Sequence, residues 1–123
     1  MAVERRGREF ATRKLKELGF DVTPMPTTSP GYDLLAKKAA EILRVEVKAH
    51  LSKAKIIDLP IGEFREYARS KVRVDNDRWE LWNVEQLGGD SSTAVEITRY
   101  AEIPEEAIEA KLLRVDLRQC ASV

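Results

Sequence analysis

The chain has 123 residues, 43% of them hydrophobic and 34% charged, a balance typical of a compact domain and not of a disordered chain. At this length we expect a single domain over residues 1–123. The net charge is zero, which as an average argues against a strongly basic nucleic-acid binder, but residues 1–74 hold 16 basic and 10 acidic side chains and residues 75–123 hold 5 and 11. This separation by sign predicts a basic face suited to a polyanion.

The sequence also bears on the cellular compartment. Cys120 is the only cysteine, which excludes an intrachain disulfide and paired-cysteine zinc motifs and favours a reducing compartment. The first eight residues lack the apolar core of a secretory signal, and no apolar run approaches the length that spans a membrane. We therefore expect a soluble cytoplasmic protein that makes no membrane contact.

The first half of the chain predicts one helix and three strands. Apolar residues from Val3 to Leu18 gather on one side of a helix, and Gly19 stands where a C-cap glycine is expected. A short strand at residues 20–22 precedes a proline-rich loop at residues 23–31. Two further strands are predicted at 33–36 and 42–49, and their connector at 37–41 is either a simple link between strands or, being rich in alanine, helical.

The second half predicts a helix, two longer strands and two short elements. Asp58 and Pro60 mark the start of a helix that runs to about Ser70. The other expected elements are strands at 79–84 and 94–100 around a turn at 88–92, a short acidic helix opened by Pro104, and a last strand at 112–117. The order αβββαββαβ predicts an α/β domain with a mixed central sheet flanked by helices.

The residues most informative about chemistry are Asp33, Glu46 and Lys48. Strand alternation places Glu46 and Lys48 on one face, and a hairpin brings the carboxylate of Asp33 beside that of Glu46. Two converging carboxylates form an oxygen-rich site suited to Mg²⁺ or Mn²⁺. An ammonium group at the edge of that site can stabilise developing charge or help a bound water lose its proton.

This pattern resembles the PD-(D/E)xK nuclease superfamily, although Tyr32 stands where that pattern has proline. The helix that closes with Leu18-Gly19-Phe20, followed by Gly31-Tyr32-Asp33, is similar to archaeal Holliday-junction resolvases and Mrr-like restriction enzymes. The stretches 57–68 and 79–84 resemble most closely the NO VEIN C-terminal domain group. The resemblance implies a restriction endonuclease-like three-layer core, with Mg²⁺ (Mn²⁺ as a substitute) bound by the two acids and the backbone carbonyl of Val47.

The same resemblance implies a glutamate on the first helix that points at the metal. Relative to Gly19, the matching position falls on Arg8. Glu4 lies one turn earlier on the correct side of the helix, so we predict Glu4 and keep Glu9 as the alternative. Either residue can equally be a solvated helix charge.

Cationic side chains cluster around the first helix and the proposed site. Such side chains contact phosphates without reading sequence, although a charge run can also be merely a solvated face. We predict a DNA-facing surface formed by Arg5, Arg6, Arg8, Arg13, Lys37, Lys38, Lys53 and Lys55.

A few other residues have two interpretations. His50 lies on the strand face of Lys48 and either contacts phosphate or water near the metal or is a polar residue at the end of a strand. Trp79 and Trp82 alternate within an apolar strand, which favours core packing over base stacking. Cys120 is expected to be a buried or idle thiol.

Together these features predict a metal-dependent DNA endonuclease of a restriction, repair or junction-processing type, acting on duplex or branched DNA. A homodimer is expected because a small enzyme with one site needs two copies to cut both strands. The alternative is a catalytically inactive module on the same fold that binds nucleic acid or a protein partner from a restriction or repair system. RNA processing by the same chemistry is a third reading.

Overall fold

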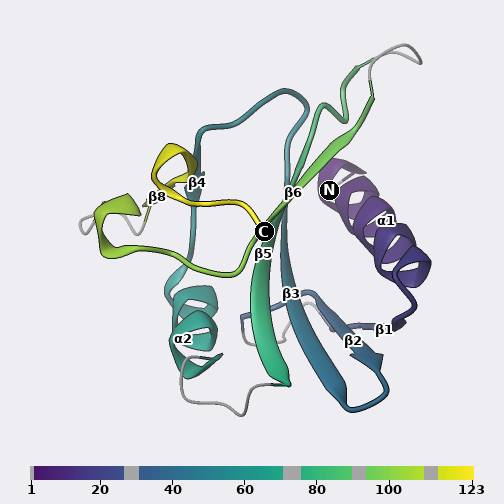
Figure 1. Cartoon of the computed structure of the whole chain (residues 1–123). Coiled ribbons are helices and arrows are strands. Elements are labelled where there is room, and N and C mark those ends of the chain that lie inside the picture. The colour runs from purple at the N-terminus through teal and green to yellow at the C-terminus, as the bar shows by residue number, and fades with distance from the viewer. Residues whose placement is uncertain (1, 27–30, 71–75, 90–93, 110–113) are drawn as a thin grey trace.

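The computed structural model describes residues 2–26, 31–70, 76–89, 94–109 and 114–123 (Figure 1). Two helices, eight strands and two short 3₁₀ helices occur within these ranges. In chain order they are α1 (Ala2–Glu17), β1 (Asp21–Pro24), β2 (Leu34–Lys38), β3 (Glu41–Ala49), β4 (Ile56–Asp58), α2 (Ile61–Ser70), β5 (Asp77–Glu85), β6 (Glu96–Tyr100), η1 (Glu105–Ala107), β7 (Ile108–Glu109), β8 (Arg114–Asp116) and η2 (Leu117–Gln119).

The central sheet has five strands in the order β1-β2-β3-β5-β6. Its neighbours are antiparallel except β3 and β5, which run parallel, so the sheet is mixed as predicted. The chain passes from β3 to β5 through β4 and α2. A second, small sheet has the order β4-β8-β7.

Alternation along β3 and β5 divides the core between the two faces of the central sheet. Leu43 and Val45 pack in one cluster with Ala11 and Leu15 of α1. Other residues of the sheet, among them Trp79, pack in a second cluster with side chains of α2 and of the small sheet. In Figure 1, α1 lies on one side of the central sheet, and α2 lies on the other with the small sheet. The result is the predicted three-layer arrangement.

The helix α1 approaches β3 very closely at Gly7, which is buried. A Cβ atom added there would lie 2.5 Å from the Cβ of Ala49. Gly7 is therefore required by packing, because any side chain at this position would push the helix away from the strand.

The connector predicted at residues 37–41 is a simple link between strands and not a helix. Its ends belong to β2 and β3, and residues 39–40 form a tight turn between them. Ala39 has a φ of 52°, a left-handed conformation that closes the hairpin. Cross-strand pairing from Leu34–Val45 to Lys38–Glu41 outweighs the helical preference of two alanines.

Other predictions need correction in the second half. Asp58 is not an N-cap, because it ends β4 and pairs with Arg114 of β8, and the helix begins only at Ile61. The expected acidic helix is a single 3₁₀ turn, η1. The last strand, predicted at residues 112–117, is observed as β8, and residues 112 and 113 lie outside the described residues. Residues 90–92 of the predicted turn also lie outside them. Among the described helices, none has the length and apolar character needed to cross a membrane.

Candidate active site

Two elements and the start of a third bring four ionisable side chains together on the α2 face of the sheet. Asp33 directly precedes β2, Glu46 and Lys48 lie on β3, and Glu63 comes from the first turn of α2. The predicted residues Asp33, Glu46 and Lys48 therefore converge, and the structure adds Glu63 to them.

Asp33 is held by both its backbone and its side chain. Its N–H donates to the carbonyl of Val45 at 2.8 Å, and its own carbonyl accepts from the N–H of Met25 at 2.8 Å. Its Oδ2 accepts from the N–H of Val47 at 2.8 Å, so the carboxylate is fixed against the strand that carries Glu46.

Glu46 is the most deeply buried acid of this cluster, with 3% of its surface exposed. Burial raises the pKa of Glu46 to about 11, with further increases from hydrogen bonding to Glu63 and Asp33 and from the charge of Asp33. The ammonium of Lys48 opposes this rise only in part. In the absence of a metal ion, the carboxyl group of Glu46 therefore retains its proton near neutral pH.

Lys48 is positioned by two carboxyl groups. Its Nζ donates to Oε1 of Glu63 at 2.9 Å and lies 3.6 Å from Oε2 of Glu46. Burial alone lowers the pKa of Lys48, but Glu46 and Glu63 outweigh that effect, and the net result is a pKa above the ordinary lysine value. The amine is thus charged and contacts the carboxyl groups of both Glu46 and Glu63.

Sequence reasoning missed Glu63 as a functional residue. An acid in the first turn of a helix is common because it favours the helix dipole, so its identity alone carries little information. The usable signal is its spacing of four residues from Tyr67, which is buried in the core and marks the inner face of α2.

The donor set fits a small divalent cation. With their carboxyl groups ionised, Asp33, Glu46 and Glu63 outnumber the single ammonium of Lys48, and a divalent cation would balance the difference. Within the described residues, no three acidic, histidine or cysteine side chains are arranged to bind one ion together. The fit is therefore to an ion such as Mg²⁺, which takes one or two protein carboxylates and keeps several waters.

The helix glutamates lie elsewhere. Glu4 and Glu9 are exposed on α1, and α1 packs against the sheet face opposite to Glu46 and Lys48. Glu9 lines a hollow between α1 and the strands β1 and β2. The structure therefore does not bring either glutamate into the cluster formed by Asp33, Glu46, Lys48 and Glu63.

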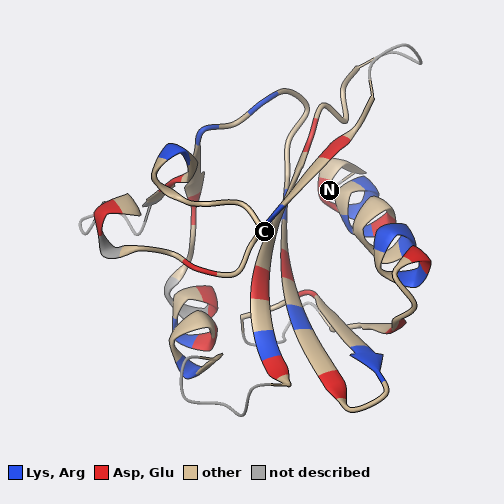
Figure 2. Ribbon diagram, in the orientation of Figure 1, with Lys and Arg blue, Asp and Glu red and all other residues tan. Residues whose placement is uncertain are grey.

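The predicted phosphate-binding cations lie along α1 and at the two ends of β3 (Figure 2). Lys37 and Lys38 lie at the hairpin before β3, and Lys53 and Lys55 follow its other end, nine residues or about 30 Å away. The arginines lie on α1. Some of them line a hollow of about 420 Å³, whose full lining is Arg5, Arg8, Glu9, Thr12, Arg13, Lys16, Pro24 and Leu34. The expectation of one continuous basic face around the acids is therefore not met by the described residues.

Some of these cations have structural roles as well. Arg6 donates to the carbonyl of Leu87 at 2.6 Å, which ties α1 to the end of β5. Lys38 donates to the carbonyl of Leu18 at 3.0 Å, where it caps the C-terminal end of α1. These two cations are therefore engaged within the fold, which weakens the case for them as phosphate contacts.

The other ambiguous residues are also located. Trp79 and Trp82 are 1% and 0% exposed, so core packing is confirmed over base stacking. His50 Nε2 lies 2.8 Å from Oδ1 of Asn83, and Asn83 is opposite Lys48 in the sheet register. Cys120 is partly buried, and its Sγ donates to the carbonyl of Asp116 at 3.7 Å.

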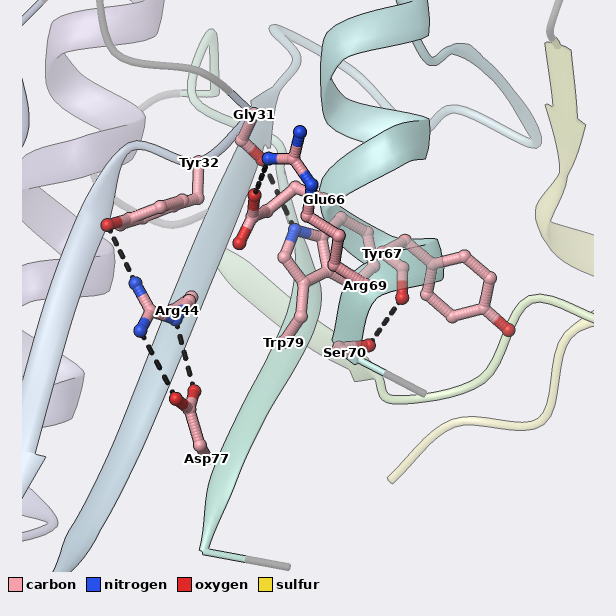
Figure 3. A network of polar contacts seen from close by, with 9 residues as sticks. All are labelled: Gly31, Tyr32, Arg44, Glu66, Tyr67, Arg69, Ser70, Asp77 and Trp79. Atoms are coloured by element: carbon pink, nitrogen blue, oxygen red, sulfur yellow. Dashed lines mark hydrogen bonds and ion pairs between the residues drawn. The ribbon is translucent and has the colours of Figure 1, made fainter. Parts of the chain in front are cut away.

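A polar network holds the segment that leads into Asp33 (Figure 3). Arg44 donates to the hydroxyl of Tyr32 at 2.9 Å and binds both carboxylate oxygens of Asp77 at 3.1 and 3.2 Å. The indole of Trp79 donates to the carbonyl of Gly31 at 3.2 Å. Two strands therefore fix the backbone immediately before the first acid of the site.

Comparison with known proteins gives a match among solved structures. No protein-family model matches the chain, and no curated protein matches it either. Among solved structures, the fold matches that of Hjc, a Holliday junction resolvase from the archaeal hyperthermophile Archaeoglobus fulgidus, with a TM-score of 0.60 over 98% of this chain and 91% of that chain. The chain shares its fold with that resolvase.

The match confirms the predicted fold class and the predicted similarity to archaeal Holliday-junction resolvases. At 14% sequence identity the likeness concerns the fold alone. The resemblance to the NO VEIN C-terminal domain group has no family model behind it and stays a prediction.

Proposed function

We propose that this protein is a metal-dependent endonuclease of the PD-(D/E)xK type that hydrolyses phosphodiester bonds in DNA. The single observation that carries the proposal is the convergence of Asp33, Glu46, Lys48 and Glu63 on one face of the sheet. A buried carboxyl group surrounded by two other acids costs stability, and such costs are concentrated at functional sites. The shared fold with an archaeal Holliday junction resolvase supports the same conclusion.

In this proposal Asp33, Glu46 and the carbonyl of Val47 would hold Mg²⁺, which Mn²⁺ could replace. The ion, when bound, supplies Lewis-acid stabilisation of the negative charge that develops on the phosphate. Lys48 would orient the attacking water and stabilise the negative charge that develops on it as its proton passes to bulk solvent. Glu63 keeps the Lys48 ammonium in place through their 2.9 Å hydrogen bond, and the water attacks in line with the leaving oxygen.

The substrate and assembly follow from the same proposal. The cations along α1 and the lysines after β3 provide separate contacts for phosphates, which suits a duplex or branched DNA longer than the site itself. A homodimer supplies the two sites needed to cut both strands, and a cytoplasmic restriction or repair system, with a protein partner from it, is the expected setting.

The alternative function is a catalytically inactive module on the same fold. The buried cluster argues against it, because a module without chemistry gains nothing from placing Glu46 beside two other acids. Titration calorimetry with Mn²⁺ separates the two functions. Binding that requires both Asp33 and Glu46 supports the enzyme, and its absence supports the module.

The direct test is cleavage of plasmid, single-stranded and branched DNA with Mg²⁺ or Mn²⁺. Glu46→Gln and Lys48→Ala should each abolish cleavage. The matched controls are Glu41→Gln, an exposed acid on the same strand, and Lys14→Ala, an exposed lysine on α1. Cleavage that survives both site substitutions would show that the activity arises elsewhere, and swapping the DNA for RNA tests the third reading.

A further inference from the structure

The proposed hydrolysis must move a proton away from the attacking water, and the four residues of the cluster are already engaged. Lys48 contacts the carboxyl groups of Glu46 and Glu63 and is charged, so its amine has no lone pair to offer. Asp33 and Glu46 would hold the ion, and Glu63 accepts the Lys48 hydrogen bond at 2.9 Å. The proton therefore needs an acceptor outside the cluster.

His50 directly follows β3 and lies next to Lys48 on the same face. Side chains alternate along the strand, so His50 is about 7 Å beyond Lys48 at the backbone. Its N–H donates to the carbonyl of Val84 at 2.9 Å, and its carbonyl accepts from the N–H of Leu87 at 3.1 Å. The backbone of His50 is therefore fixed, at a separation from Lys48 that a bridging water can span.

The imidazole of His50 is oriented by Asn83. Its Nε2 lies 2.8 Å from Oδ1 of Asn83, a residue that is 1% exposed. An amide oxygen can only accept, so Nε2 carries the hydrogen of the neutral ring and Nδ1 keeps its lone pair. Nδ1 has no hydrogen-bond partner among the residues that the structure describes. The ring therefore presents an oriented proton acceptor.

His50 also lines a hollow of about 350 Å³, together with Ile56, Ile57 and Asp58. One water takes about 30 Å³ in the liquid, so the hollow has room for several waters. It opens to solvent, because Ile56 and Asp58 are exposed. The carboxylate of Asp58 on its wall repels anions such as phosphate and favours a positively charged imidazole. The hollow thus suits water that carries a proton from His50 to bulk solvent.

We propose that His50 accepts the proton of the attacking water, through a bridging water beside Lys48, and passes it to the solvent in the hollow. The inference rests on the proposed function, because it names the proton acceptor of that reaction. The water oxygen forms a bond to phosphorus while the bond from phosphorus to the leaving oxygen breaks. One proton of the water goes to Nδ1 of His50, the leaving oxygen takes a proton from solvent, and the imidazolium returns its proton to solvent. Asn83 is a positioning residue that keeps its hydrogen bond to Nε2.

The kinetic test follows plasmid cleavage with Mg²⁺ in a buffer without imidazole. His50→Gln can keep a hydrogen bond to Asn83 but cannot carry a proton, and it should lower kcat about 100-fold with the Kd for DNA unchanged. His50→Ala should lose as much, and added imidazole should restore much of its kcat, whereas pyrazole, which has the same shape but is a far weaker base, should restore nothing. Leu51→Ala, at the exposed neighbouring residue, should cleave like the wild type and ignore imidazole. Wild-type cleavage by His50→Gln would refute the inference, and a loss confined to the Kd for DNA without rescue would mean that His50 contacts DNA instead.

A second measurement needs neither metal nor cleavage. His50 is the only histidine in the chain, so the imidazole nitrogen signals in NMR of the metal-free protein belong to it alone. The neutral ring should carry its hydrogen on Nε2, and Asn83→Ala should reduce that preference. A hydrogen on Nδ1 would refute this inference even for a protein that cuts DNA. A wild type that never cuts DNA would instead refute the proposed nuclease, and this inference with it.

Discussion

Replacing Glu46 by glutamine should make the metal-free protein more stable, and the gain should grow with pH. The substitution keeps the shape of the side chain but removes a carboxyl group that is 3% exposed and in contact with two other acids. The amide cannot ionise, so it escapes the cost of burying a charge.

The sign follows from the pKa. Burial raises the pKa of Glu46 from 4.5 to about 11 in the folded protein, so the folded state holds a proton that the unfolded state releases. The stability that this proton confers is complete below pH 4.5 and is lost as pH rises toward about 11. One such group changes stability by at most about 1.4 kcal/mol per pH unit, or about 4 kcal/mol from pH 5 to pH 8. Because Lys48 offsets part of the charge and the neighbouring acids share the proton, we expect about half of that, roughly 2 kcal/mol.

Urea unfolding of the wild type and of Glu46→Gln in EDTA measures the difference at several pH values. The free energy of unfolding of the variant should exceed that of the wild type by an amount that increases steadily from pH 5 to pH 8. Glu41→Gln, on the same strand but exposed and paired with Arg78 at the surface, should show a small difference that does not change with pH. A difference for Glu46→Gln that stays flat across this range would refute the reasoning.

Three other substitutions test the packing and the site. Gly7→Ala should lower the free energy of unfolding by about 1–3 kcal/mol, because the new methyl group meets the side chain of Ala49. In urea unfolding, the double variant with Ala49→Gly should recover much of this loss. Additive effects of the two changes would contradict the close contact. Glu63→Gln should lower kcat about tenfold with KM nearly unchanged, since Lys48 loses its charged partner, and an unchanged kcat would show that Glu63 is only structural. Tyr32→Phe removes the hydroxyl that accepts the hydrogen bond from Arg44. The variant should bind Mn²⁺ severalfold more weakly in calorimetry, while its melting temperature falls only slightly. Unaltered Mn²⁺ binding would mean that the network does not position Asp33.

The parts of the fold that the sequence predicts well are those with local patterns. The helix α1, the hairpin of β2 and β3 and the buried strand β5 each have a clear period and turn residues at their ends. The small sheet has neither. Its strands β4, β7 and β8 are only two or three residues long, and β4 pairs with β8 across about sixty residues of sequence, so no local pattern reveals the sheet. The same pairing explains why Asp58 resembled a helix cap and is instead part of a strand.

The predicted site shows the same division. The alternation of β3 fixes Glu46 and Lys48 on one face, and the hairpin brings Asp33 to them, so these three are accessible to sequence reasoning. Glu63 is not, because its place depends on where α2 packs after the crossover. The predicted helix glutamate meets a related limit, since helical spacing gives the side of a helix but not which face of the sheet that helix covers.

The neutral net charge, finally, is a poor measure of the charge that a nucleic acid would meet, because some of the acids in the second half of the chain are buried or paired within the fold. Glu80 is 3% exposed and binds Arg99 through two hydrogen bonds, and Glu85 is 9% exposed and accepts from a backbone N–H. Asp77 is occupied by Arg44 in the network beside the site. A polyanion responds to the charges that reach solvent, and these include cations of α1 and Lys53, although Lys53 lies 4.0 Å from a carboxylate oxygen of Glu96. The net charge of the whole chain therefore does not give the charge of the surface that a polyanion meets.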